Sequence, residues 1–201
     1  MKPITIILDE GHYDGCPGKR SPKLEDGTQF FEWKFARDLA NRIQVTCEQL
    51  GITCVRTTNK DNEQSLTKRA KDINQVVRKE SEKGRQCLMI SLHGNAASSN
   101  GQWANARGWE VWTTEGTTKS DDFAKLMLKH FKVIFPNDKL RGHKEKNFTL
   151  IYQCACPCVL TENFFYDNKE DLKILMSEEG MQKITDLHIA AICDYIEYDK
   201  I

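Results

Sequence analysis

Short apolar runs that alternate with amphipathic segments constrain the fold of this chain more than any other feature of its sequence. Three runs have the length and composition of buried strands: residues 4–8 (ITIIL), 52–56 (ITCVR) and 87–93 (CLMISLH). Between them, residues 30–50 place apolar side chains at near-helical spacing up to Gly51, and residues 66–83 form a second helical segment that Ser65 can cap. Strands that alternate with helices in this way predict an α/β fold with a mainly parallel sheet.

The same alternation continues in the second half of the chain. Further strands are expected at residues 107–114, 148–152 (FTLIY) and 157–162 (PCVLTE). Amphipathic helices are expected at residues 120–135, which Pro136 ends, and at residues 178–197. No internal repeat, low-complexity tract or linker interrupts the 201 residues. We therefore expect one domain over residues 1–201, with a twisted, mainly parallel sheet flanked by helices on both faces.

The balance of charges argues against two classes of partner. Lys and Arg together number 29, as do Asp and Glu, so no net field attracts nucleic acid or an anionic membrane. No apolar run approaches the length of a transmembrane helix. The apolar stretch at residues 4–8 is too short for a signal peptide and is not followed by a small-residue cleavage site. We therefore expect synthesis in the cytoplasm without a signal peptide, and a specific small or polymeric ligand as partner.

Eight cysteines are many for a chain of this length. They form no repeated C-x-x-C pair, so the sequence contains neither a zinc ribbon nor a thioredoxin motif. In CACPC, residues 154–158, a strand would place all three thiols on one face, as core residues or as a soft metal site. No histidine accompanies them, so we expect core packing.

Polar residues follow three of the expected strands. His12 comes just after the first strand, His93 closes MISLH, and Glu162 closes PCVLTE. In α/β sheets, ligands gather at the carboxyl ends of the strands, so these side chains are expected to converge. Glu32 joins them as a candidate, because it stands in the first turn of the helix that follows a long loop after His12. Loops of that length in a compact domain are usually functional or mobile.

These residue types suit a catalytic metal site. Two imidazoles and one carboxylate can hold zinc and leave a fourth position for water, and a further glutamate can then act as the base. Each residue also has a simpler explanation. Glu32 is favoured at a helix N-terminus by the helix dipole, whereas His93 and Glu162 are compatible with a satisfied strand end and a solvated turn. Their joint placement favours the metal site.

Six segments in order resemble a known family, the zinc-dependent N-acetylmuramoyl-L-alanine amidases of the amidase 3 type. The segments are ILDEGH, FFEWKFARDLANRI, SLTKRAKDIN, MISLHGNA, ARGWEVW and CVLTENFFYDN. The resemblance implies zinc bound by His12, Glu32 and His93, with Glu162 as the catalytic glutamate. It also implies that residues 1–201 are one catalytic amidase domain, which hydrolyses the bond between N-acetylmuramic acid and L-alanine in peptidoglycan.

Three residues depart from the pattern of that family. Glu10 stands where the family usually has Pro, Thr58 where Arg is frequent, and Phe164 where Gly is usual. Because Phe tolerates fewer backbone dihedrals than Gly, we expect the backbone near Glu162 to differ. These departures bear on substrate contacts more than on the chemistry.

Several other polar residues have two readings each. Arg107 and Arg141 are candidates for contact with a substrate carboxylate or with solvent alone, and Asn95 for a site contact or for its own turn. The remaining histidines, namely His130, His143 and His188, are expected to be surface or satisfied residues.

The resemblance favours a hydrolase like a phage or prophage endolysin, which acts at the cell wall or in the periplasm. Two other functions stay open. One is a zinc carboxypeptidase-like hydrolase of the stem peptide, and the other is a non-catalytic peptidoglycan-binding module, against which the intact Glu162 argues. The oligomeric state is left open by the sequence.

Overall fold

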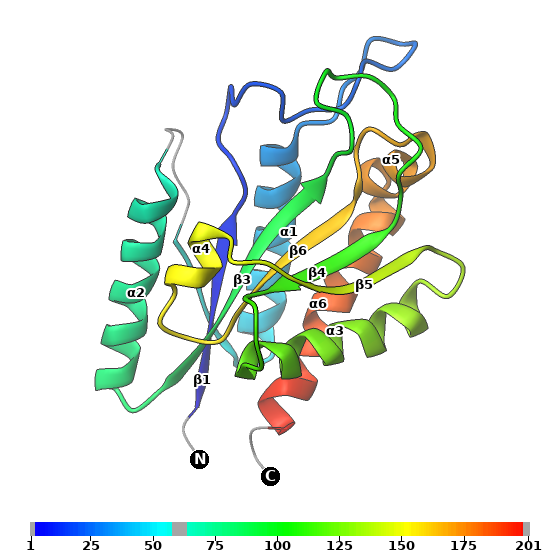
Figure 1. Ribbon diagram of the computed structural model, residues 1–201. Coiled ribbons are helices and arrows are strands. Elements are labelled where there is room, and N and C mark those ends of the chain that lie inside the picture. The colour runs from blue at the N-terminus through cyan, green and yellow to red at the C-terminus, as the bar shows by residue number, and fades with distance from the viewer. Residues whose placement is uncertain (1–2, 58–63, 199–201) are drawn as a thin grey trace.

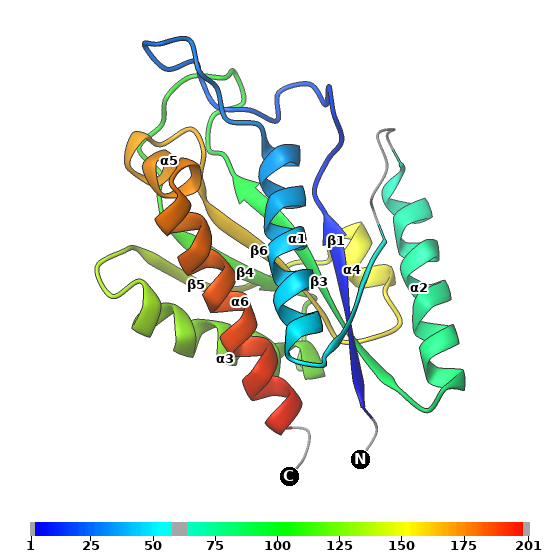
Figure 2. The ribbon, with the colours of Figure 1, turned by 180° about the vertical axis from the view of Figure 1, so that it is seen from behind.

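One six-stranded sheet runs through the molecule, and helices cover both of its faces (Figures 1 and 2). The computed structural model describes residues 3–57 and 64–198. The strands are β1 (Ile4–Glu10), β2 (Thr53–Arg56), β3 (Gln86–Asn95), β4 (Trp109–Thr113), β5 (Leu140–Glu145) and β6 (Cys158–Phe165). Their order is β2-β1-β3-β6-β4-β5. All neighbours are parallel except β4 and β6, which are antiparallel, so the predicted α/β fold with a mainly parallel sheet is confirmed.

The helices divide between the two faces of the sheet. On one face lie α1 (Glu32–Gln49), α3 (Lys119–Ile134), α5 (Lys169–Met176) and α6 (Glu178–Tyr198), seen in front in Figure 2. On the other face lie α2 (Leu66–Glu82) and the short α4 (Thr149–Gln153). The alternation of side chains along β1 serves both faces, because Ile6 and Leu8 join the larger core while Ile7 joins the smaller one.

Local signals set the ends of α2 as expected. The Ser65 side chain accepts a hydrogen bond from the backbone N–H of Lys68, and Gly84 follows the helix with φ 76°. The departure at Thr58 lies outside the described residues.

The prediction of a strand at residues 148–152 is wrong. This apolar run forms α4, in which Leu150 and Ile151 are buried while Thr149 and Tyr152 are exposed. A run of five apolar residues fits a buried strand and one turn of helix equally well, so its pattern does not decide between them.

The prediction that the three thiols of CACPC share a strand face is also wrong. Only Cys158 belongs to β6, whereas Cys154 follows α4 and Cys156 lies in the bend between the two elements. All three still pack in or against the smaller core, and none is in a disulfide. Core packing of the thiols is therefore confirmed, although the strand that was expected to produce it is absent.

Two elements have no clear counterpart in the sequence pattern. The edge strand β5, with the sequence LRGHKE, has no alternation of apolar and polar residues and is defined by its pairing with β4. The eight-residue helix α5 is capped by Asn168, whose side chain accepts hydrogen bonds from the backbone N–H groups of Glu170 and Asp171. The strand β5 thus depends on a partner that is distant in the sequence, and the helix α5 depends on a single capping residue.

Candidate metal centre

Three side chains meet beyond the carboxyl ends of β1 and β3. The Nδ1 atom of His93 lies 3.0 Å from Oε1 of Glu32, and Nε2 of His12 lies 3.2 Å from Oε2 of the same carboxylate. One potential ligand atom from each of the three residues lies within 4.8 Å of the others. A tetrahedral zinc ion with bonds of about 2.1 Å separates its ligand atoms by about 3.4 Å, which is close to these distances.

The pairing of β1 with β3 brings the two histidines together. Glu10 is in register with Leu92, and the backbone N–H of Gly11 donates to the carbonyl of Leu92 at 3.0 Å. A Cβ atom on Gly11 would lie 2.6 Å from the imidazole of His93, so only glycine fits between the strand end and that ring. His12 then turns out of the strand with φ 66°, a left-handed conformation that costs free energy for any residue with a Cβ.

The loop after β1 folds back to place Glu32. Arg20 forms an isolated antiparallel bridge with Phe31, and the backbone N–H of Glu32 donates to the carbonyl of Lys19 at 3.0 Å. Phe31 supplies no side-chain cap, so α1 begins directly with the buried carboxylate of Glu32 at its positive end. The carboxylate reaches the histidines from the helix side of the sheet.

Burial and contacts within the triad shift the pKa of each of its three members. Burial opposes ionisation of Glu32, but its contacts with His12 and His93 outweigh burial and lower its pKa to about 2. Burial lowers the pKa of His12, which favours the neutral imidazole. Burial also opposes protonation of His93, but the hydrogen bond with Glu32 outweighs it and raises that pKa.

Two ligand atoms of the triad are buried without a hydrogen-bond partner. They are Nε2 of His12 and Oε2 of Glu32, which lie at ion-pair distance but not in hydrogen-bond geometry. An unsatisfied buried polar atom costs about 1–3 kcal/mol, so such atoms need an explanation. A metal ion held by two imidazole nitrogens and one carboxylate oxygen would satisfy both atoms, and this donor set fits zinc.

The second ring nitrogen of His12 contacts a residue that the sequence pattern does not single out. Sγ of Cys16, four residues later in the same loop, lies 3.7 Å from Nδ1 of His12. Partners of this kind orient a metal-ligating imidazole. Only the turn geometry after β1 brings this thiol to the ring, so no spacing rule would have found it.

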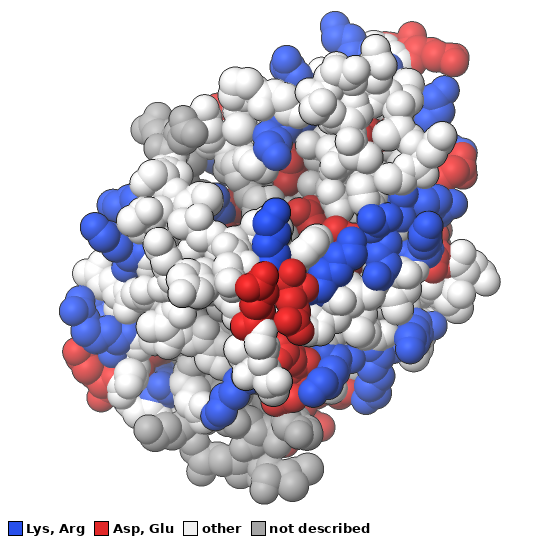
Figure 3. Space-filling model, in the orientation of Figure 1, with Lys and Arg blue, Asp and Glu red and all other residues white. Residues whose placement is uncertain are grey.

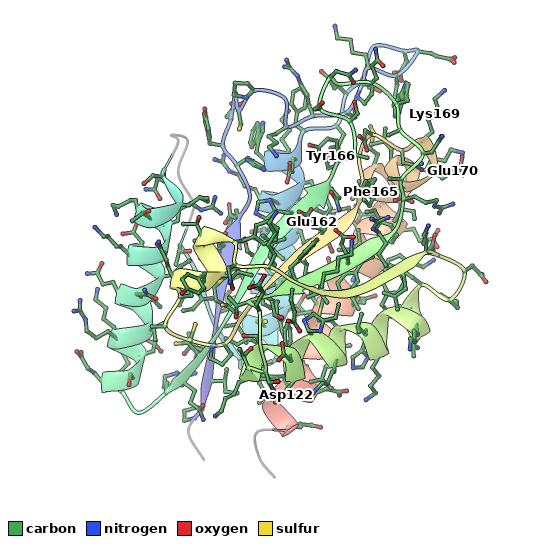
Figure 4. The ribbon with its side chains drawn as sticks, viewed as in Figure 1. Asp122, Glu162, Phe165, Tyr166, Lys169 and Glu170 are labelled. Carbon is green, nitrogen blue, oxygen red and sulfur yellow. The ribbon has the colours of Figure 1, made fainter. Side chains whose placement is uncertain are left out.

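Glu162 lies on β6, the strand next to β3 (Figure 4). It is directly in register with His93, since β3 and β6 are parallel neighbours. Its Oε2 atom is buried and has no hydrogen-bond partner in the part of the chain that the structure describes. Burial, with the charges of Glu32 and Glu110, raises the pKa of Glu162 to about 8, although His93 opposes the shift. The carboxylate is therefore held close to the triad with a high affinity for a proton.

Phe164, two residues after Glu162, adopts φ 64°. This is the left-handed region that favours glycine. The backbone at this position therefore keeps a conformation suited to glycine although the residue is Phe. Phe164 is fully buried and its ring packs against Phe131 and Phe135, with ring centroids 6.1 Å and 5.1 Å away. Burial of the ring offsets the cost of the strained backbone.

Glu10, the other described departure, is also buried. Its Oε1 atom accepts a hydrogen bond from Nε of Arg56 at 2.5 Å, which ties the end of β1 to the end of β2.

A cleft of about 570 Å³ contains the triad and Glu162. Its other lining residues include Lys19, Asn95, Lys146, Asn147, Phe148 and Tyr166. Asn95 lines the cleft, donates a hydrogen bond to Glu110 and accepts one from the backbone N–H of Ala96, so the local turn contact is present, and a site contact stays a prediction.

The two arginines considered as substrate contacts do not line this cleft. Arg107 pairs with Asp171 at 3.1 Å, and Arg141 pairs with Glu110 at 2.5 Å. Arg107 thus links the segment before β4 to α5, and Arg141 links β5 to β4.

The three remaining histidines are satisfied within the protein. His188 is completely buried, with Nδ1 donating to the carbonyl of Ile184 at 2.8 Å and Nε2 lying 3.2 Å from the hydroxyl of Thr161. His130 pairs with Asp194, and His143 contacts the hydroxyl of Thr113. The prediction of surface or satisfied residues is confirmed.

Nearly the whole chain matches one known protein family. Residues 6–194 match Amidase_3, described as N-acetylmuramoyl-L-alanine amidase. The chain belongs to this family. The match omits only the first residues of β1 and the last residues of α6 among the strands and helices, and it includes His12, Glu32, His93 and Glu162.

Curated relatives resemble the chain over most of its length. It is 27% identical to an uncharacterised cell wall amidase of Bacillus anthracis over 203 residues, which cover 96% of this chain and 36% of the relative. It is 27% identical to the N-acetylmuramoyl-L-alanine amidase CwlM of Bacillus licheniformis, covering 92% of this chain and 66% of the relative. The endolysin of Bacillus phage SPP1 is 24% identical, over 56% of this chain and 41% of the endolysin. The chain thus spans between about a third and two thirds of the length of these relatives.

A solved structure shows the same fold. The N-acetylmuramoyl-L-alanine amidase of Clostridium difficile 630 superposes with a TM-score of 0.80 at 20% identity, covering 98% of each chain. Within the described residues, no helix combines the length and apolar character needed to cross a membrane.

Proposed function

We propose that this chain is a zinc-dependent N-acetylmuramoyl-L-alanine amidase, which hydrolyses the amide bond between the lactyl group of N-acetylmuramic acid and the L-alanine of the stem peptide. Membership of the family supports the activity. The observation that carries the proposal is the juxtaposition of the triad, with its two unpartnered ligand atoms, and the unpartnered Oε2 atom of Glu162 in one cleft.

His12, Glu32 and His93 are proposed to hold the zinc ion through two imidazole nitrogens and one carboxylate oxygen. When bound, zinc would polarise the scissile carbonyl and lower the pKa of a water molecule in the open fourth position. Since the triad residues come from a strand end, a helix start and a second strand end, the folded domain presents the three ligands in one arrangement before any substrate arrives.

Glu162 is proposed as the general base and acid. Its unpartnered Oε2 atom can take a proton from the attacking water and later return it to the nitrogen of the departing L-alanine. A base that was already saturated with hydrogen-bond donors would be a weaker proton acceptor.

Residues 1–201 are proposed to act as one catalytic domain on peptidoglycan, at the cell wall or in the periplasm, as an endolysin would. The inclusion of all six strands in a single sheet supports the single domain. The likeness to the phage SPP1 endolysin supports the endolysin-like role.

Product analysis on a purified muropeptide tests the proposal. The zinc-loaded chain should release intact stem peptide with a new L-alanine amino terminus and leave the sugar without new reducing ends. Release of free D-alanine would instead identify a carboxypeptidase-like hydrolase. Binding of the muropeptide without any product would identify a non-catalytic module.

A further inference from the structure

Two lysines line the cleft, and within the described residues neither is paired with a carboxylate. Lys19 belongs to the loop after β1, and Lys146 belongs to the link between β5 and α4. In the described part of the chain, neither ammonium group forms an ion pair with a carboxylate. Glu32 and Glu162, the acidic residues of the cleft, are already assigned to the proposed metal site and to proton transfer.

The neighbouring basic residues behave differently. Lys144 lies 2.6 Å from the carboxylate of Glu110, which also accepts from Arg141. Lys and Arg form a band on the β5 side of the face shown in Figure 3, and the two cations of that strand both pair with the carboxylate of Glu110. Lys19 and Lys146 are the Lys and Arg residues that line the cleft, whereas Arg141 and Lys144 lie outside its lining and share one carboxylate.

Both lysines are placed at the reacting centre by the fold. Lys19 lines the same cleft as His12 and Glu162. Nζ of Lys146 lies 4.9 Å from the centroid of the Phe148 ring, and the backbone N–H of Lys146 donates to the carbonyl of Thr113 at 2.9 Å. A cation packed on an aromatic ring loses less freedom on binding an anion than a solvated lysine does.

We propose that Lys19 and Lys146 bind carboxylates of the stem peptide, so that the chain prefers stem peptides with free carboxylates over stem peptides in which these groups are carboxamides. The inference rests on the proposed amidase function and specifies that its preferred substrate carries negatively charged carboxylates. A stem peptide that extends from the scissile bond along the cleft passes both cations, and each free carboxylate gains a charge-assisted hydrogen bond that a carboxamide cannot match. Because the cleft is open to solvent, each lysine is expected to contribute a moderate factor.

The test uses two muropeptides of identical sequence, one with free carboxylates and one fully amidated. The wild type should show a kcat/KM about tenfold higher for the free-acid form, and Lys19→Met and Lys146→Met should each lower the ratio of the two kcat/KM values about threefold. In each variant the kcat/KM for the amidated form should fall by less than the kcat/KM for the free-acid form. The double variant should cleave the two forms equally well.

Lys125→Met is the matched control, since Lys125 is exposed on α3 and pairs with Asp122. Its selectivity should equal that of the wild type, and zinc content and thermal unfolding should be the same in all variants. Equal cleavage of both forms by the wild type, or variants that lower both rates together, would overturn the assignment of the lysines while leaving the amidase function intact. Failure to cleave either form would overturn the amidase function and this inference with it.

Discussion

Two buried polar clusters lie near the carboxyl ends of β1 and β3, and they differ in how completely their atoms are paired. In the first, Asp9 accepts from Nε of Arg69 at 2.9 Å and from the Ser91 hydroxyl at 2.7 Å, and Arg69 also donates to the carbonyl of Glu10. In the second, the triad of His12, Glu32 and His93 leaves two buried ligand atoms without hydrogen bonds.

The comparison teaches that burial and charge alone do not identify a ligand site. Asp9 and Glu32 are both almost completely buried carboxylates beside basic groups. In the Asp9 cluster the partners complete each other, as expected of a structural ion pair. In the triad two ligand atoms have no hydrogen-bond partner, and a bound cation would supply one. Substitution in the triad should therefore lower zinc binding, whereas substitution in the Asp9 cluster should lower the free energy of unfolding.

The largest effect is expected from His93→Ala. The purified chain should bind about one zinc ion, and removal of one of three ligands should lower zinc content and abolish measurable amidase activity together. Metal analysis beside a muropeptide assay checks this expectation. A His93→Ala chain that keeps its full zinc content would contradict the assignment of the triad.

Glu162→Gln separates the base from the ligands. The amide keeps the size of the side chain but cannot accept the proton, so turnover should fall by about 100- to 10,000-fold while zinc content stays unchanged. Turnover and metal content are measured on the same preparation. Loss of zinc in this variant would mean that Glu162 is itself a ligand.

Asp9→Asn should produce the opposite pattern. Loss of one member of a buried ion pair leaves the charge of Arg69 uncompensated, which typically lowers the free energy of unfolding by about 3–5 kcal/mol. The folded variant should keep its zinc. Denaturant unfolding of the metal-free chain checks the expected loss of stability, and metal analysis of the folded chain checks that zinc is retained. A variant that keeps its stability but loses zinc would contradict the contrast between the two clusters.

His188 extends the comparison to a histidine whose nitrogens are both paired. Burial lowers its pKa to about 4, so the folded state resists protonation. The stability that this neutral ring contributes is complete above its unfolded pKa of about 6.5 and is lost as pH falls through about 4, amounting to at most about 3 kcal/mol. His188→Gln should flatten the loss of stability between these pH values, measured by unfolding of the metal-free chain. An unchanged slope would show that other groups carry the acid sensitivity.

The smallest effect is expected from the thiols. Cys154→Ser should lower the free energy of unfolding by about 1 kcal/mol, because a hydroxyl packs less favourably than a thiol against the smaller core. Zinc content should not change. Loss of a metal equivalent would show that the thiols bind metal after all.

The sequence by itself determined the fold class, five of the six expected strands and the four candidate site residues. The reason is physical: strand and helix periodicities are local, and in a parallel sheet the residues that follow neighbouring strands must meet at one edge. Thus the places of His12, just after ILDEG, and of His93, at the end of MISLH, were visible in the chain, whereas the direct pairing of β1 with β3 was decided by the folded sheet.

Tertiary structure alone decided the features that depend on partners distant in the chain. The run FTLIY became α4 because Leu150 and Ile151 both face the smaller core, and β5 exists because β4 pairs with it. Arg107 and Arg141 pair with Asp171 and Glu110, which only the folded sheet brings near them, and neither arginine lines the cleft. Lys19 and Lys146 had no distinguishing pattern in the sequence, because whether a cation is neutralised is a property of its surroundings in three dimensions.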